Sequence, residues 1–264
     1  MKTLTQHITE RLKLTRDRVS KYEYFPKTKE ELEDIVYEIT NEHKHDKIID
    51  LNMIDISKIK DMAYLFYKSQ YNYNISEWDV SNVKNMEYIF AYSAFNNDIS
   101  LWNVSQVENM YAMFMNSDFN QDISQWNVSK VEYMGYIFAG SQFNGDISHW
   151  DVSSVKEMYG MFEKSKFNND ISQWNVSNVE NMSYMFAESE FNNDISKWNV
   201  SQVETMSCMF FSSKFNQDIS QWNVSNVDNM KLIFRESKFN QDLTSWKSKI
   251  KDKEQLQYIK DYIK

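Results

Sequence analysis

The sequence predicts an α/β solenoid, a stack of 24-residue strand–helix units with a helical cap at each end. Three observations support this fold class. All the tryptophans lie 24 residues apart, apolar residues recur at fixed places between them, and several polar columns keep the same register. The tryptophans are Trp78, Trp102, Trp126, Trp150, Trp174, Trp198, Trp222 and Trp246. Repeats of about 20 to 50 residues are typical of solenoids and arrays.

Each unit contains two different hydrophobic periods. In the unit 150–173, Trp150 and Val152 alternate with polar residues, which predicts a short strand. Between 155 and 162 the apolar residues are separated by three, three and one positions, which predicts one or two turns of helix. A single unit has too few core residues to fold alone, so we expect stacking to create the core.

Three polar columns also repeat, and stacking explains them. We expect the asparagine column to form a ladder that satisfies main-chain groups at a corner of each coil. We expect each aspartate to accept a hydrogen bond from a nearby backbone N–H instead of facing its neighbours. The columns are Asn96, Asn120, Asn144, Asn168, Asn192, Asn216 and Asn240; Asp98, Asp122, Asp146, Asp170, Asp194, Asp218 and Asp242; and Ser93, Ser117, Ser141, Ser165, Ser189, Ser213 and Ser237.

The repeated run F-N-x-D-I-S-x-W-N-V-S-x-V-x-x-M-x-x-M-F-x-x-S, as in 167–189, resembles the repeat of BspA-type leucine-rich-repeat surface proteins, a class that includes mycoplasma lipoproteins. The resemblance covers about residues 54–245. It implies a leucine-rich-repeat-like, right-handed solenoid with a role in binding or adhesion. It implies no catalytic residues.

The predicted organisation has three parts. Residues 1–53 form an N-terminal arm and capping helix, residues 54–245 form one degenerate and seven regular units, and residues 246–264 form a C-terminal capping helix. Leu4, Ile8 and Leu12 are spaced for a short helix, and 19–25 alternate as a strand that starts the stack.

Both caps are predicted from local signals. Thr28 followed by Glu31 has the form of a capping box, so we expect a helix over 28–42 that covers the first coil. Near the C-terminus, Leu256, Ile259 and Ile263 fall on one face of an amphipathic helix. Its lysines would face solvent, although a basic amphipathic helix is also typical of membrane surfaces. With both ends capped, we expect a monomer.

Composition narrows the class of partner. The net charge of −9 disfavours nucleic acid as a partner. The single cysteine excludes an internal disulfide framework. The sequence contains no run of apolar residues long enough for a membrane span and no recognisable signal peptide. We therefore expect a cytoplasmic protein, with the cell surface or a virion as the alternative.

The residues that vary between units are the candidates for binding. Those that flank the tryptophan and valine of each predicted strand should face solvent and form an extended surface for a protein or glycan. The alternative is a solvated strand face without a ligand. The candidate residues are Glu77, Asp79, Leu101, Asn103, Gln125, Asn127, His149, Asp151, Gln173, Asn175, Lys197, Asn199, Gln221 and Asn223.

A second candidate surface is a row of tyrosines on the predicted helix side. Exposed aromatic rows are typical of interfaces, but these rings would also fill space between neighbouring helices. The row consists of Tyr88, Tyr111, Tyr136, Tyr159 and Tyr184, with Met115 and Phe211 nearby in the pattern.

The sequence offers little for catalysis or metal binding. His43 and His45 lie beside Asp46 with no further ligand nearby in sequence, and Cys208 occupies a position that packs in other units. Calcium-binding β-roll repeats need glycine turns, and the chain has 4 glycines. We therefore expect no cofactor, no metal and no enzymatic activity. The predicted function is a non-enzymatic binding module, with a surface adhesin or a virion or phage structural component as the alternative.

Overall fold

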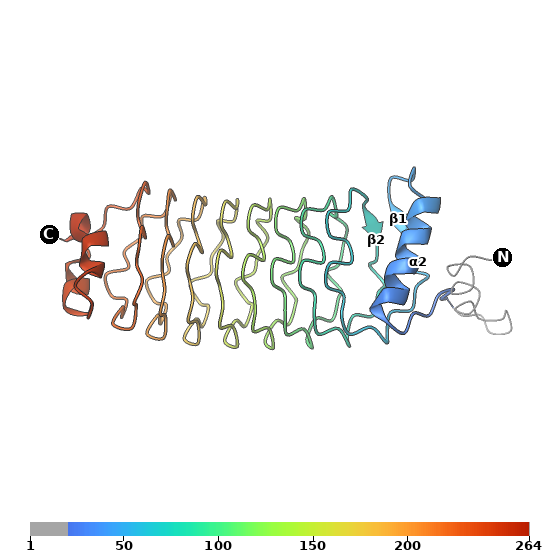
Figure 1. The fold of residues 1–264 in the computed structure, drawn as a ribbon, viewed down its shortest axis with the longest axis horizontal. Coiled ribbons are helices and arrows are strands. Elements are labelled where there is room, and N and C mark those ends of the chain that lie inside the picture. The colour runs from blue at the N-terminus through green and yellow to red at the C-terminus, as the bar shows by residue number, and fades with distance from the viewer. Residues whose placement is uncertain (1–20, 264) are drawn as a thin grey trace.

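The computed structural model of this chain describes residues 21–263. The chain winds into a row of coils stacked along one axis, with α2 (Lys29–Glu42) at one end and short 3₁₀ helices at the other (Figure 1). The strands β1 (Ile49–Asp50) and β2 (Tyr73–Asn74) pair in parallel near α2. The predicted elements at Leu4, Ile8 and Leu12 lie outside the described residues.

The predicted N-terminal helix is confirmed as α2. Thr28 is its N-cap, and the Thr28 hydroxyl accepts a hydrogen bond from the Glu31 N–H at 3.2 Å. Glu31 in turn accepts from the Lys27 N–H at 2.7 Å, one residue earlier than in a regular capping box. Leu32 and Ile35 are buried in this helix, so its apolar face covers the first coil. Of the strand expected over 19–25, the described part makes a parallel bridge between Tyr24 and Ile54.

The repeated apolar residues form one continuous core. Each tryptophan is at most 4% exposed, and the repeated valines, methionines and phenylalanines beside it are also buried. Phenylalanine rings of successive coils stack in parallel, for example Phe90 on Phe114 with centroids 5.6 Å apart. Each indole N–H donates to a main-chain carbonyl of the preceding coil, as Trp174 does to Ile147 at 3.0 Å. The tryptophan therefore contributes both packing and a buried hydrogen bond that joins two coils.

The helix predicted in each regular unit is not formed. In the segment 158–164, alternate N–H groups donate to the next coil instead: Met158 to Asn181 O at 3.0 Å, Gly160 to Ser183 O at 2.9 Å. The residues between them donate to carbonyls three positions back, as Met161 does to Met158 at 3.2 Å. The N–H groups needed for an α-helix are thus used between coils and in tight turns. The apolar residues that were predicted to form one face of a helix are buried, but their backbone forms turns instead of a helix.

These turns depend on a left-handed backbone at two places in every unit. One column includes Tyr88 and Tyr136, with φ of 53° and 56°. The other lies four residues later and includes Tyr92 with φ 58° and Gly140 with φ 64°. Such angles are uncommon for residues other than glycine, and the bonds between coils hold them in place.

The strand predicted at each tryptophan is also replaced. In the described repeat units, a single parallel β-bridge joins each coil to the next, at a position after the predicted strand, for example between Glu157 and Asn181. At the predicted strand, the Trp174 N–H donates back to the Ile171 carbonyl at 3.1 Å, which bends the chain. The Asn175 side chain then accepts from the Ser177 N–H at 3.2 Å and bends it again.

The asparagine ladder and the local role of the aspartates are confirmed. The Asn168 side-chain oxygen accepts from the Asn192 backbone N–H of the next coil at 2.8 Å, and the contact repeats along the column. In the same corner, Asp170 accepts from the Ser172 N–H two residues later at 2.8 Å. The serine column lies just inside, where Ser189 is buried and its hydroxyl donates to the Phe186 carbonyl.

The C-terminal amphipathic helix is replaced by three 3₁₀ helices. They are η1 (Thr244–Ser248), η2 (Gln255–Tyr258) and η3 (Lys260–Tyr262). From η2 to η3, apolar residues recur every three positions, at Leu256, at Ile259 between the two helices and at Tyr262, which matches about three residues per 3₁₀ turn. The segment still closes the stack, because Tyr262 packs on Phe234 with ring centroids 5.1 Å apart.

Candidate functional site

The fourteen predicted binding residues are all exposed, and they form two rows beside the buried tryptophans. We call the two rows together the tryptophan-side face. One row directly precedes the tryptophans and the other directly follows them. Because every unit has the same length, both rows run along the stack without interruption.

The row that follows the tryptophans has a structural role in each coil. Each of its side-chain oxygens accepts a hydrogen bond from the N–H two residues later, as Asn103 does from Ser105 at 3.2 Å and Asp151 from Ser153 at 3.1 Å. The bond is a turn-forming one that Asn and Asp both provide. This explains why only these two residue types occur in the row, and it leaves little variation for recognition.

The row that precedes the tryptophans is chemically varied. Leu101 is 88% exposed, so nearly all of its apolar side chain faces solvent. Gln125, Gln173 and Gln221 each donate from the side-chain amide to the hydroxyl of the preceding serine, at 3.1–3.3 Å. Glu77 forms an exposed ion pair with Lys21 at 3.0 Å. The structure thus separates a varied row from a structural row on the same face.

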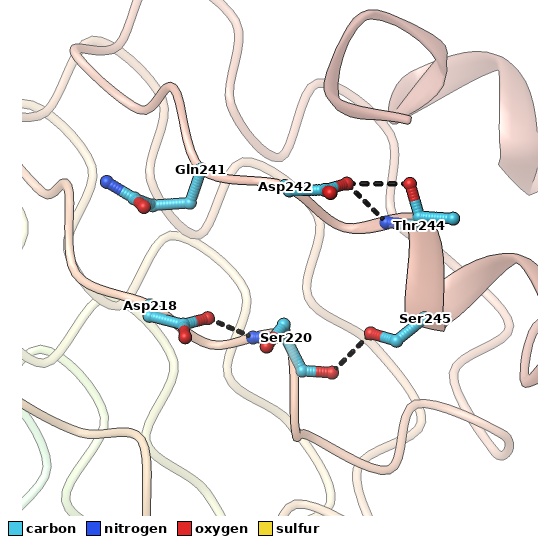
Figure 2. A pocket seen from close by; sticks show the side chains of 6 residues that line it. All are labelled: Asp218, Ser220, Gln241, Asp242, Thr244 and Ser245. Atoms are coloured by element: carbon cyan, nitrogen blue, oxygen red, sulfur yellow. Dashed lines mark hydrogen bonds between the residues drawn. The ribbon is translucent and has the colours of Figure 1, made fainter. Parts of the chain in front are cut away.

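The aspartate column adds negative charge beside these rows. The backbone N–H and hydroxyl of Ser100 hold the pKa of Asp98 below its ordinary value, and Ser148 does the same for Asp146. Both carboxylates therefore stay charged at neutral pH. In Figure 2, Asp218 and Asp242 line a hollow of about 280 Å³ at two successive corners of the chain.

That hollow is a gap between two hydrogen-bonded corners. The Ser245 hydroxyl donates to the Ser220 carbonyl across it at 2.6 Å, and Asp242 accepts from the Thr244 N–H at 2.9 Å (Figure 2). Asp218 accepts from the Ser220 N–H at 2.8 Å. These bonds hold the two corners together.

The predicted tyrosine row is continuous and half-buried. Neighbouring rings from Tyr88 to Tyr184 lie with their centroids 4.8–5.8 Å apart. Tyr136 lies against Gly160, where an added Cβ would be 2.3 Å from its ring. Tyr111 lies against Gly135 in the same way, at 2.8 Å. The rings thus occupy gaps in adjacent coils, as the packing interpretation predicts, while part of each remains accessible.

The sequence analysis missed the exposed end of this row. Tyr64 stacks on Tyr88 with centroids 4.9 Å apart, and Tyr67 contacts both Tyr88 and Tyr92 edge to face. The Lys68 ammonium lies 5.0 Å from the Tyr67 ring centroid. Tyr64 and Tyr92 are 46% and 40% exposed. The sequence signal that could have predicted this exposed end was the high number of tyrosines in the degenerate unit before Trp78.

The residues considered for chemistry are separated in the structure. His43 Nδ1 lies 2.8 Å from Asp46 Oδ2, and both side chains are about half exposed. Cys208 is buried, with its sulfur 3.8 Å from the Lys231 carbonyl oxygen. Over residues 21–263, no group of three or more His, Cys, Asp or Glu residues is placed to hold a metal ion.

The sequence of the chain matches one known protein family. The family described as "Mycoplasma protein of unknown function, DUF285" matches residues 32–142, 117–212 and 167–260, which overlap to cover most of the chain. The chain belongs to this family. DUF285 matches the repeat units together with most of α2 and the C-terminal cap.

Two further comparisons found nothing. No curated protein and no solved structure matches the chain. In the part of the chain that the structure describes, none of the helices has the length and apolar character to cross a membrane.

Proposed function

We propose that the chain is a non-enzymatic binding module whose tryptophan-side face engages a protein or a glycan. The observation that carries the proposal is the division of this face into two rows. The row that follows the tryptophans is restricted to Asn and Asp by its turn bonds. The row that precedes them includes Leu101, His149 and Lys197, all exposed.

The shape of the stack supports the same function. Solenoid proteins bind partners along extended surfaces built from successive repeats. We propose that this stack is a right-handed solenoid of the leucine-rich-repeat kind, in line with the resemblance of its repeat to the BspA type. Burial of the exposed Leu101 side chain against a partner would remove apolar surface from water, which is favourable.

The test is affinity capture from a lysate of the natural source. The intact chain is compared with a variant that carries Leu101→Ser, His149→Ser and Lys197→Ser, because none of these side chains makes a hydrogen bond to another residue within 21–263. A matched control carries Gln142→Ser, Lys166→Ser and Gln202→Ser, which are exposed at other positions of the coils. A partner retained by the control and lost by the first variant supports the proposal. A partner retained equally by all three chains would refute it.

Glycan partners need a separate assay. Immobilised glycans of defined composition are probed with the same three chains. Binding that depends on Leu101, His149 and Lys197 places a glycan on the tryptophan-side face.

Location decides between the two forms of this function. The resemblance of the repeat to that of BspA-type surface proteins favours a surface adhesin, and the other form is a cytoplasmic binding module. Protease treatment of intact cells degrades the chain only if it is displayed outside. Protection until lysis would contradict the adhesin.

A further inference from the structure

The end of the stack that carries α2 differs from the regular coils in charge. Glu30, Glu33 and Asp34 are exposed on the outward face of α2. Tyr37, one turn further on, is 69% exposed. Lys29 is the one basic residue of this helix, and it pairs with Glu33 at 3.7 Å. The outward face of α2 is therefore an acidic surface around an exposed aromatic ring.

A hollow of about 430 Å³ is lined by residues of both α2 and the first coil. α2 contributes Glu33, Asp34 and Tyr37 to its lining, and the first coil contributes Leu65 and Tyr71. Among residues 21–263, none that lines the hollow is lysine, arginine or histidine. The hollow thus combines apolar walls with two carboxylates, which favours a basic group next to an apolar one.

The polar groups at the base of the hollow already bond to one another. The Tyr73 hydroxyl lies 2.9 Å from the Ser69 hydroxyl and 3.5 Å from the Thr40 hydroxyl. These groups need no external partner, and the rings and Leu65 remain available to an apolar side chain.

The first coil also presents main-chain carbonyls without a donor. In the second coil, the carbonyls of Glu87 and Ile89 accept from N–H groups of the first coil at 2.9 and 3.0 Å. The corresponding carbonyls of the first coil belong to Asp61, Ala63, Leu65 and Tyr67, and no described residue donates to them. They recur at every second residue, as acceptors along a sheet edge do.

Only a narrow partner can reach these carbonyls. α2 packs on the core of the first coil, and a helix is about 10 Å wide. Hydrogen-bonded chains lie about 4.8 Å apart, so α2 keeps a complete further coil from approaching to that distance. A single extended segment beside α2 needs no such space. Addition of a strand to an open edge is a common mode of peptide recognition.

We propose that the groove between α2 and the first coil binds an extended polypeptide segment of a partner protein, with lysine or arginine next to an aliphatic or aromatic side chain. Main-chain N–H groups of the segment donate to Ala63, Leu65 and Tyr67. An apolar side chain enters the hollow, and the basic side chain contacts Glu33 and Asp34. This site is separate from the tryptophan-side face.

The probe is a fluorescent ten-residue peptide in which lysine alternates with valine and one central valine is replaced by tyrosine. We expect saturable binding to the full-length chain, measured by fluorescence anisotropy. Glu33→Lys with Asp34→Lys should weaken binding at least about tenfold, because two attractive charges become repulsive. The matched control, Glu204→Lys with Asp228→Lys, exchanges exposed carboxylates on distant coils and should leave binding unchanged.

N-methylated peptides test the main-chain contact. Methylation of one alternate set of amides should abolish binding, because those N–H groups face the first coil. Methylation of the other set should have little effect. A peptide with glutamate in place of every lysine should not bind.

Several results would overturn the proposal. One is the absence of saturable peptide binding up to about 1 mM. Another is that the control variant weakens peptide binding as much as Glu33→Lys with Asp34→Lys does. A third is that both methylation patterns weaken peptide binding equally. Concentration-dependent sedimentation of the chain alone, abolished by Glu33→Lys with Asp34→Lys, would assign the groove to a second copy. Hydrogen-exchange protection of residues 1–20 that is lost in the same variant would assign it to that segment.

Discussion

The indole N–H of Trp174 donates to the carbonyl oxygen of Ile147, 27 residues earlier in the preceding coil. The same bond joins each tryptophan to the coil before it, at 2.9–3.2 Å. The tryptophan is thus fixed by a hydrogen bond as well as by its size.

Trp174→Phe should therefore destabilise the stack beyond the loss of packing. Phenylalanine retains an aromatic ring but removes one of the two donors to the Ile147 carbonyl, which still accepts from the Trp150 N–H at 3.1 Å. Loss of this one hydrogen bond should cost about 0.5–1.5 kcal/mol. Urea unfolding followed by circular dichroism measures the change in free energy. Gln173→Ser, at the exposed neighbouring position, is the control and should be within about 0.5 kcal/mol of the native chain. A Trp174→Phe chain as stable as this control would show that the bond contributes nothing.

The asparagine ladder predicts a difference between two substitutions at one position. Asn168→Ala removes the oxygen that accepts from the Asn192 N–H, and it should cost about 1 kcal/mol at this exposed site. Asn168→Asp keeps an acceptor oxygen and should cost less. Both are measured by urea unfolding. Equal losses for the two variants would mean that the acceptor is not what stabilises the corner.

The contact between Tyr136 and Gly160 predicts a coupled pair. Gly160→Ala should destabilise by about 1–3 kcal/mol, because its Cβ would lie 2.3 Å from the Tyr136 ring. The positive φ of 58° at Gly160 adds backbone strain of its own, although Ala112 adopts φ 53° at the same place in another unit. In a Tyr136→Ala background the cost of Gly160→Ala should fall to the part caused by this backbone strain. A double-mutant cycle with additive losses would contradict this explanation.

Partial burial of Tyr111 predicts loss of stability at high pH. Desolvation raises the pKa of Tyr111 from 10.0 to about 12. The folded chain therefore favours the neutral phenol, and this contribution is complete below pH 10 and is lost as the pH rises towards about 12. Unfolding in urea across this range, compared with Tyr111→Phe, measures the effect. The native chain should lose more stability than the variant, and parallel losses would contradict the assignment.

Removal of one complete unit should leave a folded chain. Contacts in the stack are mainly between adjacent coils, and the unit 198–221 contains none of the glycines that accommodate a tyrosine ring, so its deletion joins two compatible surfaces. The deletion places Tyr184 next to Leu232, which occupies the same place in its unit. A cooperative unfolding transition with a smaller dependence on urea is expected. Aggregation or a non-cooperative transition would contradict nearest-neighbour stacking.

The sequence was sufficient to predict which residues are buried, because period and side-chain type determine that directly. Trp174 and Phe162 are buried as expected, and Asn168 and Asp170 bond as expected. The backbone between 155 and 162 was not predictable in the same way. Its spacing fits one face of a helix, and only the bonds between coils select turns instead.

Positive φ at tyrosine was equally hard to foresee. Glycine at 140 and 160 marked the two columns, but most units place other residues there, such as Tyr88 and Glu188. The exposure of the candidate binding residues follows from alternation with Trp and Val. The groove beside α2 could not be predicted, since it depends on how the helix lies against the first coil.

The fit of tyrosine against glycine has a consequence for the order of the units. Nearly identical repeats could exchange neighbours during folding and stack one unit out of place, at a small difference in energy. Tyr111 requires the gap at Gly135, and Tyr136 requires the gap at Gly160. A chain that skipped or exchanged either coil would place a ring against a side chain. These few irregular positions thus determine which coils can be neighbours, and they favour one order of stacking in an otherwise uniform repeat.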